Sequence, residues 1–152
     1  MYINIREALS SEIAVLLNFE NEIIAFERPF DDSLKNGEIH YYDLLALIKS
    51  DHASVLVAEL NGYIIASGYA KIVAAENYLK FDEYVHLGFM YVKPEFRGQG
   101  INKKILDNLI NWAKTKNINE VRLEVYDENE TAKKAYAKAG FKPNMLEMRI
   151  EI

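Results

Sequence analysis

Apolar and polar residues alternate in several short stretches of the chain, which is the pattern of β-strands that bury one face. The second and third of these stretches flank Asn61-Gly62, a dipeptide typical of a tight β-hairpin. Pro94 ends the fourth stretch, because proline cannot donate to a strand ladder. The predicted strands span residues 3–5, 55–60, 63–73, 84–92 and 121–125, and Phe141 with residues 145–150 supplies the last strand or strands.

Apolar residues recur at helical spacing in the stretches between these strands. Ser10 or Ser11 can cap the first helix, and Pro29 marks its end. The second helix follows the turn signal Asn36-Gly37, and the last one ends at Gly140, a natural C-cap residue. The predicted helices span residues 10–27, 38–49, 98–116 and 129–139. An antiparallel meander followed by strand–helix units predicts a mixed α/β or α+β fold.

Composition limits the classes of function that this chain can have. The 152 residues contain no internal repeat or linker, so we expect a single domain over residues 1–152. The absence of cysteine excludes disulfides, thiolate zinc sites and a cysteine nucleophile. The net charge of −5 argues against a nucleic-acid partner. The first residues lack the pattern of a signal peptide, and no apolar run approaches the roughly 18 residues of a membrane span, so we expect a cytoplasmic protein without a membrane partner.

Residues 91–103 carry the most informative pattern, in which a strand end and a proline precede two glycines at a helix start. Gly98 and Gly100 let backbone N–H groups approach a ligand closely, and a helix N-terminus presents unpaired donors with a partial positive charge. This chemistry suits a pyrophosphate, and Arg97, Lys103 and Lys104 add positive charge to an otherwise acidic protein. The dinucleotide fingerprint and the P-loop both fit poorly. The alternative is a plain connection in which the glycines only permit the turn.

The same segment resembles motif A of the Gcn5-related N-acetyltransferases (GNAT), whose core reads Arg/Gln-x-x-Gly-x-Gly/Ala. Arg97 and Gly100 take the first and fourth core places, and Asn102 takes the sixth, where the family prefers Gly or Ala. Residues 129–141 are similar to a later family motif, Asn-x-x-Ala-x-x-x-Tyr-x-x-x-Gly-Phe, and carry all of its marked residues. The order of elements agrees with the family over nearly the whole chain.

The resemblance implies a fold and a cosubstrate. The fold is a mixed, mostly antiparallel sheet of six to seven strands, flanked by about four helices, with a splayed central strand pair. The reaction uses acetyl-CoA and no metal, with the pantetheine arm bonded to strand backbone as an added strand would be. The implied acetyl-CoA-binding residues are Met90, Tyr91, Val92, Arg97, Gly98, Gln99, Gly100, Ile101, Asn102, Lys103, Asn129 and Tyr136.

Two of these residues have a second interpretation. Tyr136 matches the family tyrosine near the CoA sulfur, where a phenol would protonate or hydrogen-bond the departing thiolate. The same residue would also pack on the apolar helix face beside Ala132 and Ala139, and the two interpretations are compatible. Asn129 either bonds the pantetheine or caps the helix that it begins.

The general base is His86 or Glu83. His86 lies six residues before Val92, at the place where some family members carry a catalytic glutamate, and a neutral imidazole suits the task near pH 7. The alternative is a core histidine with one hydrogen bond. Glu83 is the second candidate, although a regular strand turns it to the opposite side.

The acceptor wall is predicted near the end of the first helix. Glu20 and Glu27 fall on its apolar stripe, so they either line a pocket for a cationic amine, with Arg28 beside them, or reach the surface or pair with Arg28. Tyr41 and Tyr42 either add aromatic contacts to this wall or belong to the core.

The resulting hypothesis is an N-acetyltransferase that acetylates a primary amine of a small molecule by direct attack in a ternary complex. A protein or peptide N-acetyltransferase is the alternative within the class. A non-catalytic acyl-CoA-binding module and an interaction domain are the alternatives outside it. A homodimer is expected as a possibility by analogy with the family.

Overall fold

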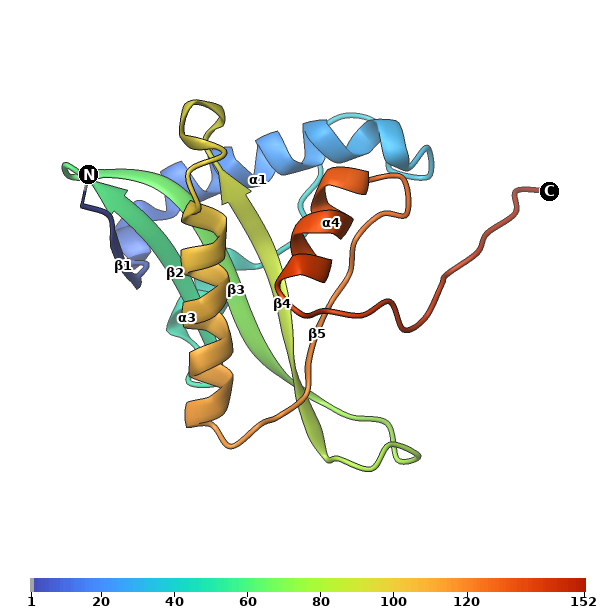
Figure 1. Cartoon of the computed structure of the whole chain (residues 1–152). Coiled ribbons are helices and arrows are strands. Elements are labelled where there is room, and N and C mark those ends of the chain that lie inside the picture. The colour runs from blue at the N-terminus through green and yellow to red at the C-terminus, as the bar shows by residue number, and fades with distance from the viewer. Residues whose placement is uncertain (1) are drawn as a thin grey trace.

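The computed structural model describes residues 2–152 of the chain (Figure 1). Its helices are α1 (Ile13–Glu27), α2 (Leu44–Lys49), α3 (Ile101–Thr115) and α4 (Glu130–Lys138), with the 3-10 turns η1 (Ser10–Glu12), η2 (Arg28–Phe30) and η3 (Pro94–Phe96). Its strands are β1 (Asn4–Glu7), β2 (Ala53–Leu60), β3 (Tyr63–Ala74), β4 (Glu83–Val92) and β5 (Val121–Leu123). None of the helices in this described part of the chain is long and apolar enough to cross a membrane.

Within residues 2–152 the strands form one sheet in the order β1-β2-β3-β4-β5. The first four strands pair antiparallel, and β4 and β5 pair parallel through the crossover helix α3. The β2–β3 hairpin turns at Asn61 and Gly62, which both adopt positive φ (51° and 82°), as the dipeptide predicts. The mixed α/β fold of the sequence prediction is therefore confirmed.

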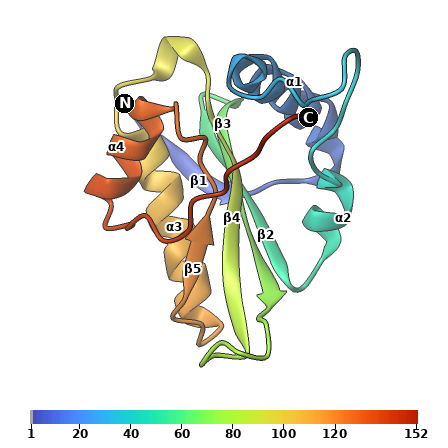
Figure 2. The same ribbon diagram turned by 90° about the vertical axis from the view of Figure 1, so that its right-hand side faces the viewer.

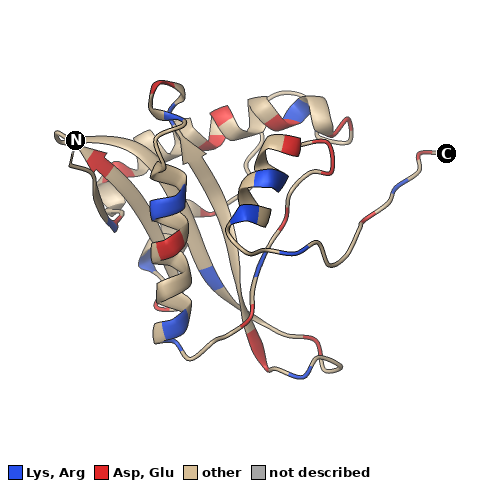
Figure 3. Ribbon diagram, viewed as in Figure 1, with Lys and Arg blue, Asp and Glu red and all other residues tan. Residues whose placement is uncertain are grey.

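Helices cover both faces of the sheet, α3 and α4 on one and α1 and α2 on the other (Figure 2). The first face is closed by the apolar side of α3, where Ile105 and Leu109 are fully buried against the strands. The second is closed by Leu16 and Phe19 of α1 and by Leu44 of α2. Positive and negative residues are interspersed over both layers, as Figure 3 shows, so a polyanion must be held by local donors.

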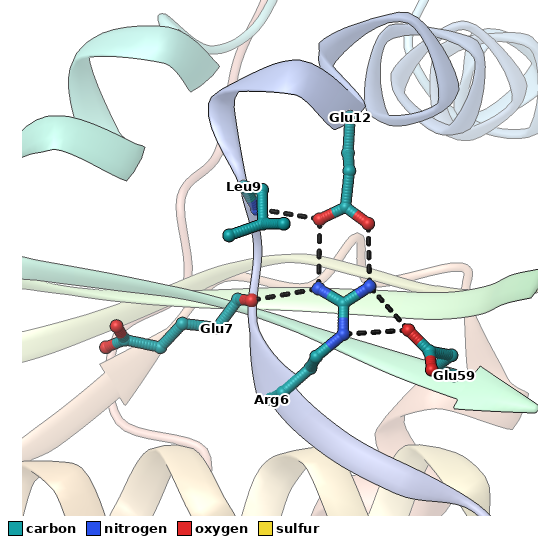
Figure 4. A network of polar contacts seen from close by, with 5 residues as sticks. All are labelled: Arg6, Glu7, Leu9, Glu12 and Glu59. Atoms are coloured by element: carbon teal, nitrogen blue, oxygen red, sulfur yellow. Dashed lines mark hydrogen bonds and ion pairs between the residues drawn. The ribbon is translucent and has the colours of Figure 1, made fainter. Parts of the chain in front are cut away.

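A network of ion pairs around Arg6 joins β1, β2 and the start of the first helix (Figure 4). The guanidinium donates to Glu12 at 2.7 and 2.9 Å and to Glu59 at 2.6 and 2.8 Å. Glu12 also accepts the Leu9 N–H at 2.7 Å, so this carboxylate rather than a serine side chain holds the helix start. These bonds lower the pKa of Glu12, chiefly through the hydrogen bond from Arg6.

The second predicted helix is shorter than expected. Only its last part, α2, is helical, and Asp43 caps it by accepting the Ala46 N–H at 3.1 Å. The reason is Glu20, whose carboxylate accepts the backbone N–H groups of Tyr41 and Tyr42 at 3.0 and 2.9 Å. Backbone donors that are satisfied by a buried side chain are not available to a helix.

The prediction of six to seven strands is wrong for the part of the chain that the structure describes, which has five. The difference lies after α4, where residues 141–152 form no strand and the large apolar side chains from Met145 onward are exposed. Their alternation is that of a strand, but a strand also needs a neighbouring edge to pair with. β5 is likewise shorter than predicted, ending at Leu123.

Candidate active site

The central feature of the site is a gap between β4 and β5. The two strands pair only at three positions, and the last of them joins Leu87 to Leu123. From Gly88 to Val92, β4 therefore pairs with β3 alone, and its other edge offers backbone groups to a ligand. This separation agrees with the splayed strand pair that the family resemblance implies.

A β-bulge in β4 lies where the gap opens. Tyr69 pairs with Gly88 and Ser67 with Tyr91, so β4 carries one extra residue. Phe89 adopts φ of 57°, a left-handed conformation that is uncommon for a bulky residue. The buried Ser67 hydroxyl donates to the Phe89 carbonyl at 3.0 Å and stabilises the bulge. The bulge re-aims the backbone of β4 toward the gap.

The side chains of the open segment belong to the core, which leaves the backbone for a ligand. Met90 and Val92 pack on the α3 face of the sheet. Tyr91 packs on the α1 face, with its ring centroid 4.5 Å from that of Phe19, and its hydroxyl bonds Glu22. Residues 90–92 therefore fit the predicted role of holding an extended ligand by main-chain bonds.

The turn between β4 and α3 presents backbone donors. Gly98 and Gly100 adopt φ of 75° and 78°, and Gly100 is the N-cap of α3. A Cβ atom would meet nothing within 4 Å at either glycine, so the backbone conformation, not crowding, requires them. Within residues 2–152 no side chain caps α3, which leaves its first N–H groups free. Free N–H groups at the positive end of a helix fit a diphosphate, so the residues present fit CoA.

The basic side chains of this turn are partly engaged. Arg97 turns back along β4, where its Nε donates to the Val92 carbonyl at 2.8 Å and its guanidinium lies 5.8 Å from the Tyr91 ring centre. Lys103 pairs with Asp107 at 2.6 Å on the exposed side of α3. Ile101 is buried in the core, so it contributes only its backbone. The backbone is thus the main source of donors in this turn.

A carboxylate surrounded by phenols lies near the end of α1. Burial raises the pKa of Glu27, and its charge in turn contributes to the raised pKa values of Tyr41, Tyr42, Tyr126 and Tyr136. For each tyrosine the largest cause is burial of the phenol. Tyr136 itself lies on α4, on the other face of the sheet from α1.

Tyr136 is half-buried on α4 and packs edge-on against Phe141, with ring centroids 5.9 Å apart. A raised pKa keeps the phenol protonated at neutral pH, as a proton donor requires.

The side-chain oxygen of Asn129 accepts the Ala132 N–H at 3.2 Å, so this residue is the helix N-cap. Only its amide NH₂ remains for a ligand.

A cavity of about 510 Å³ lies on the α2 side of the sheet, next to the Glu27 cluster. Its lining residues are Tyr41, Tyr42, Asp43, Ala46, Leu47, Ser50, Tyr69, Lys71 and His86. Burial lowers the pKa of His86, so the imidazole is neutral near pH 7. Glu83 is an exposed residue at the start of β4 and does not line this cavity.

Gly88 fixes the position of one cavity wall. The Tyr69 ring lies against this glycine, where a Cβ atom would come within 2.5 Å of the Tyr69 hydroxyl. The ring then stands 6.1 Å from the His86 ring, and burial raises the pKa of Tyr69 to about 12. The bulge region thus shapes both the gap and the cavity.

Comparison with known proteins decides the family. Residues 16–141 match the model of the acetyltransferase (GNAT) family. The chain belongs to this family. It is 29% identical over 150 residues to the thialysine N-epsilon-acetyltransferase of Bos taurus, covering 91% of this chain and 84% of that protein. It is 26% identical over 125 residues to a putative ribosomal protein bS18-alanine N-acetyltransferase of Bacillus subtilis, covering 82% and 72%.

Solved structures support the fold. A mutant of the BH1408 protein of Bacillus halodurans superposes with a TM-score of 0.86 at 19% identity, covering 98% of this chain and 99% of that one. A predicted acetyltransferase of Clostridium acetobutylicum, solved with acetyl-CoA, superposes with a TM-score of 0.73 at 22% identity, covering 99% and 96%. This GNAT protein is accordingly an acetyl-CoA-dependent N-acetyltransferase.

Two residues predicted at the acceptor wall have structural roles in this GNAT protein. Glu20 is fully buried, and besides the two backbone bonds it is 2.7 Å from Nδ1 of His40. Arg28 donates to the carbonyls of Lys35 and Gly37 at 2.8 and 2.7 Å and so holds the loop after α1. The hydrogen-bonding groups of Glu20 and Arg28 are therefore occupied within the protein, whereas Glu27 lies near the phenols.

Other site residues had no signal in the sequence. The Tyr126 hydroxyl donates to Asp31 at 2.8 Å and joins the loop after α1 to the end of β5. Glu124 and Lys71 both act on the pKa of His86, with opposite signs. Lys71 lines the cavity together with His86, whereas Glu124 does not and acts on His86 only through its charge. The pairing of His86 with Arg122 in the β4–β5 register is the kind of information that a single sequence lacks.

Proposed function

We propose that this GNAT enzyme acetylates a primary amine of a small molecule by direct attack, with the acceptor entering from the cavity lined by His86. The observation that carries the proposal is this cavity, which is lined by His86 together with Tyr41 and Tyr42, the two phenols whose pKa values the charge of Glu27 helps to raise. A volume of about 510 Å³ is in the usual range of small-molecule sites, and three tyrosines give it apolar walls with polar tips.

Each part of the site would hold one part of the reactants. The free N–H groups from Gly98 to Lys103 would hold the diphosphate, and the backbone of Met90 to Val92 would hold the pantetheine arm. Bound acetyl-CoA supplies an activated acetyl thioester. The amine nitrogen would form a bond to the acetyl carbon as the carbon–sulfur bond breaks, and Tyr136 would give its phenolic proton to the leaving sulfur.

Glu27 and His86 are the two candidates for the group that takes a proton from the acceptor ammonium. Burial raises the pKa of Glu27, which brings this carboxyl closer to the range of a general base, and its charge contributes to the raised pKa of Tyr136, the proposed acid. His86 lies four residues before Met90, or about 13 Å along a strand, so it would act through water or on the distal part of the acceptor. We therefore favour Glu27 over the histidine that the sequence suggested.

The test is a steady-state assay of thiol release from acetyl-CoA against a panel of small amines and a panel of peptides. The absence of cysteine in the chain removes any protein background from a thiol reagent. Turnover with a small amine and none with the peptides is expected. Turnover with peptides alone would overturn the small-molecule acceptor and favour the peptide alternative that the Bacillus subtilis relative represents.

The variants Glu27→Gln and His86→Gln, assayed across pH, identify the base. If Glu27 is the base, kcat/KM of the wild type falls as pH drops through its raised pKa, above the ordinary 4.5. Glu27→Gln should lose this limb and about 10² in rate, while His86→Gln keeps the limb. Loss of the limb only in His86→Gln, at a pH below the ordinary 6.5 of histidine, would assign the role to His86.

A further inference from the structure

One lysine, Lys71 of β3, lines the proposed acceptor cavity. It stands directly opposite His86 in the β3–β4 ladder, and both residues line the same cavity. Lys71 is half-buried, and none of the ion pairs within residues 2–152 involves it. Its ammonium instead lies 5.8 Å from the Tyr69 ring centre. A partly desolvated lysine is usually paired, so an unpaired one at a cavity wall is available to an anionic ligand.

The positive charge of Lys71 acts on the interior of the cavity. Burial lowers the pKa of His86, the charge of Glu124 opposes this shift, and the charge of Lys71 adds to it. A neutral His86 leaves Lys71 as the only cationic side chain among the residues that line the cavity. Because a neutral imidazole still carries one N–H, Lys71 and His86 can donate together to one anionic group.

The other polar groups of the cavity favour an anion with a single charge. Tyr69 lines the same wall, and burial raises the pKa of this phenol to about 12, so it remains a hydrogen-bond donor at neutral pH. Asp43 also lines the cavity and supplies a negative charge at the start of α2, where its carboxylate accepts the Ala46 N–H at 3.1 Å. One cation in the presence of one fixed anion can neutralise a carboxylate, whereas a phosphate dianion would need a second cation.

The position of Lys71 in the sheet separates this anion site from the place of reaction. In the proposed function the amine reacts beside the backbone of Met90 to Val92. Lys71 pairs with His86, four residues before Met90, and four residues of strand span about 13 Å. The lysine side chain covers part of this span, which leaves room for an acceptor whose amine and anionic group are separated by several methylene groups.

We propose that the acceptor is an ω-amino carboxylate, in which a methylene chain joins the reacting amine to a carboxylate that Lys71 binds, an assignment that rests on the proposed function of the site. The Lys71 ammonium pairs with the carboxylate, and the N–H of His86 and the hydroxyl of Tyr69 donate to it. His86 is then a residue that binds the acceptor, which agrees with its distance from the reacting atoms and with Glu27 as the preferred base.

Three acceptors of equal chain length test the assignment. In ω-aminopentanoate, pentylamine and cadaverine the reacting amine is the same, and the far end is a carboxylate, a methyl group or an ammonium. In the thiol-release assay the wild type should show a kcat/KM for ω-aminopentanoate about tenfold above that for pentylamine, as a hydrogen-bonded charge contributes. The difference should lie in KM, because the carboxylate is bound equally in the ground state and the transition state.

Substitutions of Lys71 assign the preference to this side chain. Lys71→Met removes the charge and should bring the ratio of the two kcat/KM values close to one, Lys71→Arg should keep the preference, and Lys71→Glu should favour cadaverine over ω-aminopentanoate. Lys80→Met is the matched control, because it removes the same charge from an exposed residue that does not line the cavity. Its ratio should equal that of the wild type.

The comparison of acceptors by the wild type does not depend on the folding of any variant. Equal kcat/KM for ω-aminopentanoate and pentylamine would overturn the assignment and leave the proposed function intact. A preference of the wild type for cadaverine would overturn it too, and would point to a dication bound at Asp43. A preference for ω-aminopentanoate that persists in Lys71→Met would exclude Lys71 as the binding group. Turnover of no small amine at all would overturn the proposed function, and this assignment with it.

Discussion

Replacement of Glu20 by glutamine tests the structural role of this carboxylate. The carboxylate accepts two backbone N–H groups, from Tyr41 and Tyr42, in a site with no solvent exposure. Hydrogen bonds to a charged group contribute about 1 kcal/mol more than neutral ones, so two such bonds give about 2 kcal/mol. The bond to the exposed His40 is left out, because solvent screens it.

For a chain of this length, a loss of about 2 kcal/mol should lower Tm by about 4–8 °C. The assay is thermal unfolding at neutral pH, with Glu38→Gln as the control. Glu38 also contacts His40, at 3.3 Å, but its side chain is 83% exposed, so its replacement should leave Tm nearly unchanged. An unchanged Tm for Glu20→Gln together with a raised KM for the amine would refute the structural role and restore the predicted acceptor-binding role.

The Glu20→Gln variant should also change the pKa of His40. The hydrogen bond to Glu20 raises the pKa of His40, with smaller contributions from its charge and from Glu38. Because the folded pKa is raised, the stability that His40 contributes is present below its unfolded pKa and is lost as pH rises through the folded value. In Glu20→Gln the carboxylate is gone, and the His40 pKa measured by NMR should fall toward or below its ordinary value.

Three further substitutions test the site. Tyr136→Phe removes the proposed proton donor and should lower kcat by about 10² while leaving CoA affinity unchanged, so an unchanged kcat would contradict the acid role. Gly88→Ala places a Cβ 2.5 Å from the Tyr69 hydroxyl and should lower the free energy of unfolding by about 1–3 kcal/mol, with Tyr69→Ala suppressing part of the loss in a double-mutant cycle. Gly98→Ala strains φ of 75° and should weaken CoA binding in a calorimetric titration, whereas Gly37→Ala carries the same strain at φ of 82° outside the turn and should not.

Local patterns predicted most of the fold. The hairpin at Asn61-Gly62, the helix starting near Gly98 and the order of strands depend on turn chemistry and on apolar periodicity, which act over a few residues. The same reasoning found the turn between β4 and α3, because glycines with positive φ leave a local mark in the sequence. Such features can be predicted without knowing which residues contact one another in the folded chain.

The features that the sequence did not predict all depend on contacts between distant residues. Glu20 prevents the start of the second predicted helix by binding the backbone more than twenty positions away, and no local propensity registers this. The Tyr126 hydroxyl likewise bonds Asp31, 95 positions away in the chain, and so joins the segment after β5 to the loop after α1.

Whether the last predicted strand forms also depends on contacts between distant residues. Its alternation specifies which side chains share one face of the strand. It does not specify which sheet edge the strand pairs with, because residue periodicity and strand propensity contain no information about the partner. In this molecule the outer edge of β5 stays unpaired within residues 2–152, and the segment instead meets the loop after α1, where Arg149 pairs with Asp32 at 2.7 Å. The choice between these two neighbours depends on side chains more than a hundred positions apart, which no pattern within the segment records.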